Sequence, residues 1–309
     1  MNSFSSYEKF QQIREQTESE RQAANRPHEV LYFHKVDDPY SHLTIQCLEQ
    51  LESSYEITLK FILIGEENLE TVHEPSLYNI YCLQDVNRIA PFYNIDFQAH
   101  EYPAKELVEK ANSILTAAKS DDLIEIANKV NSALWEGDIG TLDKLSSTYF
   151  ATKAEVKENL IQGNKIRDAK GYYFGSAFYY EKELYWGVDR LPYLEERLAE
   201  LGAKKAHEIQ NICPLELKAP IKFTSDKKVN LYYYPSLNSP YTFVSTKRVR
   251  QMREDYPINL ITKPVLPMLM RMMTIPGFKA KYIISDAARE GRRHNHEMKS
   301  IYSPIGKPA

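Results

Sequence analysis

Cysteine is scarce in this sequence of 309 residues. It occurs three times, at Cys47, Cys82 and Cys213, and no two of these positions have the spacing of a CxxC motif or of a metal site. A redox pair at a single turn is therefore absent, which argues against disulfide exchange by the chain's own thiols. A small number of cysteines without CxxC or metal-site spacing is typical of proteins in a reducing compartment. We therefore expect structural thiols and a cytoplasmic location.

Long apolar runs and several motifs are missing as well. No apolar run approaches the length of a bilayer span, and residues 1–27 are polar and lack the apolar core of a signal peptide. There is no glycine-rich phosphate loop and no GxSxG motif, and His294-Asn295-His296-Glu297 lacks the spacing of metal-binding histidines. A net charge of −3 favours neither nucleic acid nor an anionic membrane as a partner. We expect no metal, no nucleic acid and no membrane.

What the sequence does contain is a repeat. A constant offset of 201 residues carries the segment that begins at Leu31 onto the segment that begins at Tyr232, without a gap. Identical residues in this register are Tyr32 and Tyr233, Pro39 and Pro240, Tyr40 and Tyr241, Tyr55 and Tyr256, Ile57 and Ile258, Leu59 and Leu260, Asp85 and Asp286, and Arg88 and Arg289. So many identities in one register predict an internal duplication.

Both copies have the pattern of a strand, a helix and a second strand. In the first copy, residues 29–34 and 57–63 are apolar runs suited to buried strands, and helical spacing extends from Pro39 to about Leu51. Proline is favourable at the first helical position because no backbone N–H is needed there, and the preceding residue lies at the positive end of the helix dipole. We therefore expect chemistry at positions 38 and 239.

The turn Ser239-Pro240-Tyr241-Thr242 resembles the active-site turn of one thioredoxin-fold group. That group contains the disulfide oxidoreductase DsbA, kappa-class glutathione transferases and 2-hydroxychromene-2-carboxylate isomerase. The DsbA branch has a Cys-Pro-x-Cys turn here, whereas the transferase and isomerase branch has a serine whose hydroxyl faces the sulfur of bound glutathione. The resemblance extends to Ala133-Leu134-Trp135-Glu136-Gly137-Asp138-Ile139 and to residues 178–191, which include Trp186-Gly187.

The resemblance implies an α/β protein whose thioredoxin-like fold carries a helical insertion and is present in tandem, with a truncated second copy. The 43% of hydrophobic residues is enough for the cores of such units. The predicted organisation is an N-terminal helix or tail over 1–27, a complete DsbA-like domain over 28–210 with its insertion at about 104–170, a linker over 211–228, and a partial second unit over 229–309.

By the same resemblance, Ser239 would be the catalytic residue that holds the thiolate of glutathione. A serine hydroxyl at a helix N-terminus can donate to a thiolate, and the helix dipole favours the same charge, so both lower the pKa of a bound thiol. The alternative is that Ser239 only caps a helix. The residues expected to bind glutathione or substrate are Pro240, Tyr241, Lys263, Pro264, Val265 and Asp286.

The first copy departs from the family pattern at its equivalent site, Asp38-Pro39. Aspartate is a good helix cap, but two negative charges about 4 Å apart repel by roughly 1–4 kcal/mol, so Asp38 should oppose a thiolate. Ser176 stands where the family has a cis-proline facing the turn, and a non-proline cis bond costs about 2.5–4 kcal/mol. We therefore predict that Asp38, Pro39 and Ser176 form a degenerate site.

Two functions from different classes follow. The resemblance implies a glutathione-dependent transferase or isomerase, or a related oxidoreductase, acting on a small electrophilic or aromatic substrate. The alternative is a non-catalytic binding or scaffold protein whose thioredoxin-like sites are degenerate, and a homo-oligomer would relieve the truncated unit of its exposed apolar surface. From Thr246 onward the chain has a local charge of +8, which suits an anionic ligand such as glutathione, although a solvated basic surface is the simpler interpretation.

Overall fold

The computed structural model describes residues 5–66, 71–118, 122–205, 211–214, 225 and 227–298. The chain divides into two compact units, one formed by residues 17–217 and the other by 1–16 with 218–309. Helix α2 (Tyr7–Ala23) contributes residues to both. Most of the predicted linker and the predicted C-terminal end of the second repeat lie outside the described residues.

The 17–217 unit is built on a mixed sheet of four strands. These are β1 (His28–His34), β2 (Ile57–Leu63), β3 (Ala177–Tyr180) and β4 (Glu183–Trp186), in the order β2-β1-β3-β4. Strand β1 is parallel to β2 and antiparallel to β3, which is antiparallel to β4. The mixed α/β class predicted from the sequence is confirmed, and the strand order and directions agree with a thioredoxin-like sheet.

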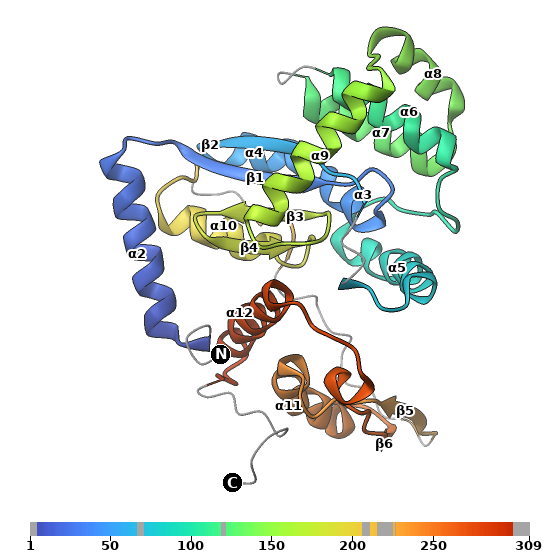
Figure 1. The fold of residues 1–309 in the computed structure, drawn as a ribbon. Helices are drawn as coiled ribbons and strands as arrows, with labels where there is room; N and C mark the ends of the chain where they lie inside the picture. The colour runs from blue at the N-terminus through green and yellow to red at the C-terminus, as the bar shows by residue number, and fades with distance from the viewer. Residues whose placement is uncertain are drawn as a thin grey trace. The chain divides into compact units, whose positions relative to one another are not determined.

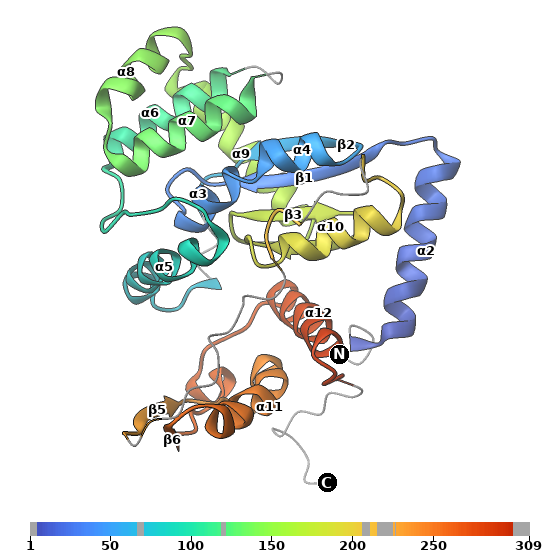
Figure 2. The same cartoon turned by 180° about the vertical axis from the view of Figure 1, so that it is seen from behind.

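Strand β1 is buried from Val30 to His34 because helices cover both faces of the sheet. Figures 1 and 2 show α4 (Leu48–Ser54) and α10 (Leu191–Glu200) over one face and α9 (Lys153–Ala169) across the other. The approach of α9 requires a glycine, since a Cβ at Gly163 would lie 1.9 Å from the carbonyl oxygen of Leu63. Glycine therefore sets how closely this helix meets β2.

The helix after β1 is shorter than the sequence predicts. It consists of α3 (Pro39–Ile45) and then α4, with Gln46 and Cys47 between them. The N–H of Cys47 binds the carbonyl oxygen of Thr44, three residues back, so the turn tightens and the helix ends. The prediction of one helix from Pro39 to about Leu51 was wrong at this point.

Helices follow β2 in a continuous series. They are α5 (Pro75–Ile89), the 3-10 helix η2 (Ala90–Tyr93), α6 (Lys105–Ala117), α7 (Leu123–Glu136), α8 (Ile139–Thr148) and α9. Local sequence sets several ends: Gly137 is left-handed after α7, Asp138 caps α8, and Thr152 with Glu155 forms a capping box on α9. The described residues of the block predicted at about 104–170 are thus mostly helical.

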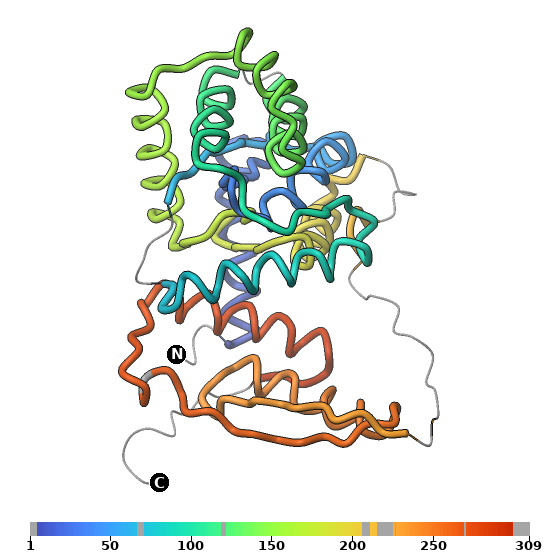
Figure 3. Tube along the Cα trace, turned by 90° about the vertical axis from the view of Figure 1, so that its right-hand side faces the viewer, coloured from blue at the N-terminus to red at the C-terminus, as the bar shows by residue number. Residues whose placement is uncertain are grey.

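The other unit has a two-stranded parallel sheet among its described residues. Strand β5 (Val229–Tyr233) leads through a turn to α11 (Pro240–Asp255), which leads to β6 (Ile258–Thr262), η3 (Met268–Arg271) and α12 (Gly277–Arg293). Helix α11 packs against β6 and α12 (Figure 3). One small cluster of buried hydrophobic residues in the described part of this unit contains Val244, Ala287, Ala288 and Met298, with Tyr241 against it.

Candidate functional site

The first turn holds Asp38 in a closed network. Asp38 caps α3, and its carboxylate accepts the N–H of Tyr40 at 3.2 Å, the N–H of Ser41 at 3.0 Å and the hydroxyl of Ser41 at 2.7 Å. The residue is only 8% exposed. Burial raises the pKa of Asp38 above its ordinary value, although the hydrogen bonds from Ser41 oppose this.

Gly175 and Ser176 cover this carboxylate. A Cβ at Gly175 would lie 2.9 Å from Asp38 Oδ2 and 2.8 Å from Ser41 Oγ, so the backbone of the chain fills the space above the turn. Ser176 has a φ of 54° and no peptide bond in the described residues is cis. Its Oγ lies 2.6 Å from Thr44 Oγ1 and donates to the Tyr40 carbonyl oxygen at 3.0 Å. The three predicted residues of this turn, Asp38, Pro39 and Ser176, therefore lie together in a packed structural contact.

The second turn places a hydroxyl where the first has a carboxylate. Ser239 caps α11, Pro240 is the first helical residue, and Ser239 Oγ accepts the N–H of Thr242 in a long hydrogen bond of 3.4 Å. Ser239 is partly exposed. Accepting a hydrogen bond leaves the hydroxyl proton of Ser239 free to donate to a ligand.

The two turns share their backbone and side-chain contacts at the offset of 201 residues. The β1–β2 register pairs His28 with Ile57, and the β5–β6 register pairs Val229 with Ile258. Tyr40 donates to Asp85 at 2.8 Å, as Tyr241 does to Asp286. Three more hydrogen bonds of the first turn recur in the second. The bond from Ile64 N to His34 O corresponds to that from Val265 N to Pro235 O, and the bond from Asp38 N to Lys35 O corresponds to that from Ser239 N to Ser236 O. The bond from Lys35 N to Ser41 Oγ corresponds to that from Ser236 N to Thr242 Oγ1.

The other residues predicted at the second site differ in burial and in the residues that they contact. Asp286 is 2% exposed and accepts hydrogen bonds from Tyr241 and, at 3.2 Å, from Arg289. Lys263 Nζ lies 4.8 Å from the ring centre of Tyr232. Val265 bridges Ser236 in the turn, and Pro264 is exposed. The structure thus joins Tyr241 to Asp286 and Val265 to the turn, while Lys263 contacts Tyr232 of β5.

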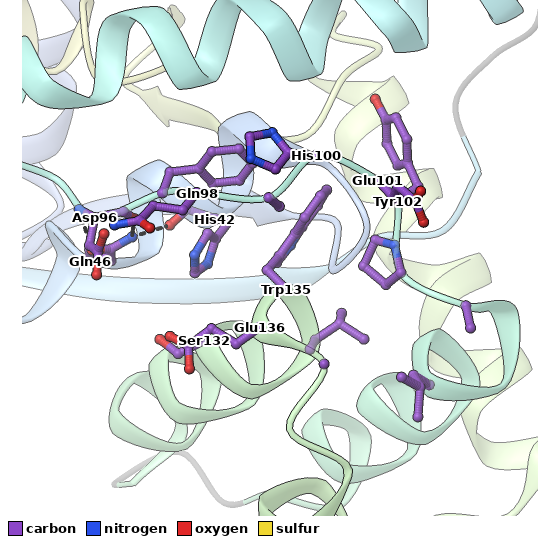
Figure 4. A pocket seen from close by; sticks show the side chains of 17 residues that line it. His42, Gln46, Asp96, Gln98, His100, Glu101, Tyr102, Ser132, Trp135 and Glu136 are labelled. Atoms are coloured by element: carbon purple, nitrogen blue, oxygen red, sulfur yellow. Dashed lines mark hydrogen bonds between the residues drawn. The ribbon is translucent and has the colours of Figure 1, made fainter.

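Sequence reasoning missed a cavity in the 17–217 unit. It has a volume of about 730 Å³ and lies between α3, the segment 96–104 and the end of α7 (Figure 4). Trp135 extends from α7 toward the segment 96–104, with His42 and Tyr102 on either side. The ring centres of His42, Phe97 and Tyr102 lie 6.1, 5.4 and 5.8 Å from that of Trp135.

The walls of this cavity are fixed by hydrogen bonds. The Gln46 side chain donates to the Asp96 carbonyl oxygen at 2.9 Å and accepts its N–H at 3.3 Å. Asn87 donates to the carbonyl oxygen of Ala99 at 2.7 Å, and the Trp135 indole donates to that of Val36 at 3.1 Å. Trp135 therefore connects the cavity with the loop that precedes Asp38.

Two buried histidines of this unit, His34 and His42, are neutral. Burial lowers the pKa of His42 to about 4 and that of His34 to about 3. His34 shares a hydrogen bond of 2.9 Å with Asn131, whereas Nδ1 of His42 is buried without a hydrogen-bond partner. His42 and Trp135 were visible in the sequence, but nothing in their spacing indicated that they meet.

The three thiols all belong to the 17–217 unit. Cys47, Cys82 and Cys213 are buried and form no disulfide, and the sulfur atoms of Cys47 and Cys213 are 3.8 Å apart. Their contact and their burial both raise the pKa of the Cys213 thiol. No helix in the described part of the chain is long and apolar enough to cross a membrane.

Comparison with known proteins gives a limited result. No protein-family model and no curated protein matches the chain. Two similar solved structures are 2-hydroxychromene-2-carboxylate isomerase, with 21% identity and a TM-score of 0.40, and a candidate protein disulfide isomerase from Nitrosomonas europaea, with 14% identity and a TM-score of 0.44. Each match covers 56% of this chain and 96% of the other. These values support no conclusion about activity, and the thioredoxin-like sheet stands on its strand order and directions.

Proposed function

We propose that this chain is a tandem thioredoxin-fold protein of the DsbA-like group that binds glutathione at the Ser239 turn. One observation carries the proposal. The turns at Asp38 and Ser239 have the same strand register and the same surrounding hydrogen bonds, but differ in the group presented at the helix N-terminus. A duplication in which the first site became structural and the second kept its hydroxyl explains this pattern.

The chemistry of the two groups separates their roles. Ser239 can donate its hydroxyl proton to a thiolate, and helix α11 of 16 residues adds the partial positive charge of its N-terminus. Asp38 would place a second negative charge near the sulfur, at a cost of roughly 1–4 kcal/mol. A bound thiol is therefore favoured as the thiolate at Ser239 and disfavoured at Asp38.

The charge of the chain that follows the Ser239 turn suits an anionic tripeptide. The chain from Thr246 onward has a local charge of +8, and glutathione is an anion at neutral pH. Pro240, Tyr241, Pro264 and Val265 are expected to line its site, with the Tyr241–Asp286 hydrogen bond fixing the first turn of α11. Bound glutathione would supply a thiolate nucleophile for transfer to, or isomerisation of, a small electrophile.

Calorimetric titration of the full chain tests this function. We expect reduced glutathione to bind one site per chain, and we expect Ser239→Ala to weaken that binding by about tenfold or more, since a hydrogen bond to a charged group contributes about 1.5–3 kcal/mol. Ser236→Ala, which removes a hydroxyl elsewhere in the same turn, is the matched control and should bind as the wild type does. S-methylglutathione, which cannot form a thiolate, should be insensitive to Ser239→Ala. The proposal would be overturned if Ser239→Ala bound reduced glutathione as tightly as the wild type does, with the binding of S-methylglutathione likewise unchanged.

A second candidate is a non-catalytic binding protein. The closure of the first turn by Gly175 and Ser176 favours it, because the larger unit then has a ligand-sized cavity but no thiol site beside it. The two candidates differ in turnover. Glutathione-dependent loss of a chlorodinitrobenzene probe, abolished in Ser239→Ala, supports the enzyme, whereas binding without turnover supports the alternative.

A further inference from the structure

We propose that the cavity between α3, the segment 96–104 and the end of α7 binds a small organic cation with a flat aromatic body. This site is separate from the glutathione turn and does not depend on it. Its volume of about 730 Å³ lies within the range of about 300–1,000 Å³ that is usual for small-molecule sites. Such a volume suits a ligand of one or two fused rings with a short aminoalkyl chain.

The charge of the lining selects a cation. Asp96, Glu101 and Glu136 line the cavity together with two histidines, His42 and His100, and no lysine or arginine is among the described residues that line it. His42 adds no positive charge at neutral pH because burial lowers its pKa to about 4. The carboxylates attract a positive ligand and repel an anion such as glutathione, so the two proposed sites differ in the charge that they accept.

The aromatic side chains of the cavity favour a flat, aromatic ligand. Phe97 and Trp135 are buried and in ring contact, and Trp135 also contacts Tyr102. Figure 4 shows Trp135 and Tyr102 at the wall of the cavity. An aromatic ring stacks on such a wall, and a cation near its faces is attracted by the ring quadrupoles. Because Gln46, Asn87 and the Trp135 indole hold the wall by hydrogen bonds, little ordering is needed on binding.

His42 is an independent indication of a ligand. It is 5% exposed, lines the cavity and leaves Nδ1 without a hydrogen-bond partner. Buried polar atoms are nearly always paired, so an unpaired one in a cavity wall calls for an explanation. In a neutral imidazole one ring nitrogen is a hydrogen-bond acceptor. A protonated amine has hydrogen-bond donors and no acceptor. The three carboxylates, with the neutral ring of His42 in the same lining, therefore match an amine.

A series of indoles of one shape and different charge tests the proposal on the full chain. Tryptamine is the cation, tryptophol the neutral analogue and indoleacetate the anion. We expect tryptamine to bind most tightly in calorimetric titration, tryptophol more weakly, and indoleacetate without saturation.

Two carboxylate substitutions locate the site. The variant Glu101→Gln with Glu136→Gln should bind tryptamine about tenfold more weakly, since each exposed carboxylate contributes a factor of about three. Its tryptophol binding should be unchanged, which also shows that the variant is folded. Glu158→Gln, the same change on α9 outside the cavity, should leave tryptamine binding unaltered.

Three results would overturn the proposal: indoleacetate binding as tightly as tryptamine, tryptamine binding that the double variant does not change, or no binding of tryptamine at all. None of them bears on glutathione at Ser239, so failure here and failure of the proposed function are distinguishable.

Discussion

Replacing Gly175 by alanine tests whether the first turn is closed. The added methyl group would lie 2.8 Å from Ser41 Oγ, 2.9 Å from Asp38 Oδ2 and 3.1 Å from Lys35 Cβ. Gly175 has no left-handed backbone conformation that would make alanine unfavourable in itself. Any effect of the substitution must therefore come from the contacts above the turn.

The cost can be worked out from those contacts. Ser41 and Asp38 are joined by a hydrogen bond of 2.7 Å, so neither can move away without disturbing the cap of α3. Overpacking of a well-packed site costs about 1–3 kcal/mol, and loss of an N-cap costs about 1 kcal/mol. We expect Gly175→Ala to reduce the free energy of unfolding by about 2–4 kcal/mol.

Urea unfolding followed by tryptophan fluorescence measures this change. Trp135 and Trp186, the two tryptophans of the chain, both lie in the 17–217 unit, so the signal reports that unit. Gly140→Ala is the control, because its Cβ would meet only Asp138 Oδ1 at 3.4 Å and alanine favours helix α8 by up to about 1 kcal/mol. Equal urea midpoints for Gly175→Ala and the wild type would mean that space exists above Asp38, and the closed turn would be refuted.

Three further predictions concern stability. Burial raises the pKa of Glu195 to about 7, so the folded state holds a proton that the unfolded state releases, and wild-type stability should fall as pH rises from about 5 to 8. In Glu195→Gln the free energy of unfolding should decrease by about 1–3 kcal/mol less over this pH range than in the wild type. If the urea midpoint of Glu195→Gln depended on pH as the wild-type midpoint does, this prediction would be contradicted. Gly163→Ala should destabilise by more than about 3 kcal/mol, because its Cβ would lie 1.9 Å from a backbone oxygen of β2; a native-like midpoint would show that α9 can move away. Residues 17–217 expressed alone should unfold cooperatively on heating, whereas 229–309 alone should be unfolded or aggregated; a sharp reversible transition of the latter would show an independent domain.

The local elements could be predicted from the sequence because their signals are local. Strand β1 is an aromatic run, and α3 starts at a proline preceded by a capping aspartate. The prediction that Asp38 caps a helix likewise needed only its chemistry and its place before Pro39.

The cavity and the closed turn could not be predicted in this way. The cavity is assembled from residues near 42–46, 96–104 and 132–137, and Gly175 reaches Asp38 only through the pairing of β3 with β1. These contacts depend on packing between distant segments, and no spacing rule encodes them. The break between α3 and α4 was also missed. It includes Gln46, whose side chain donates to the carbonyl oxygen of Asp96, a residue distant in the sequence.

The pKa of the thiol of bound glutathione tests the central claim most directly. Thiolate absorbance in the ultraviolet, measured against pH on the full chain saturated with glutathione, reports that pKa. If Ser239 and the N-terminus of α11 hold the sulfur, the pKa should be lower than that of free glutathione by about one unit or more, and Ser239→Ala should raise it by about one unit. A bound thiol with the pKa of free glutathione, equal in the wild type and in Ser239→Ala, would contradict the account.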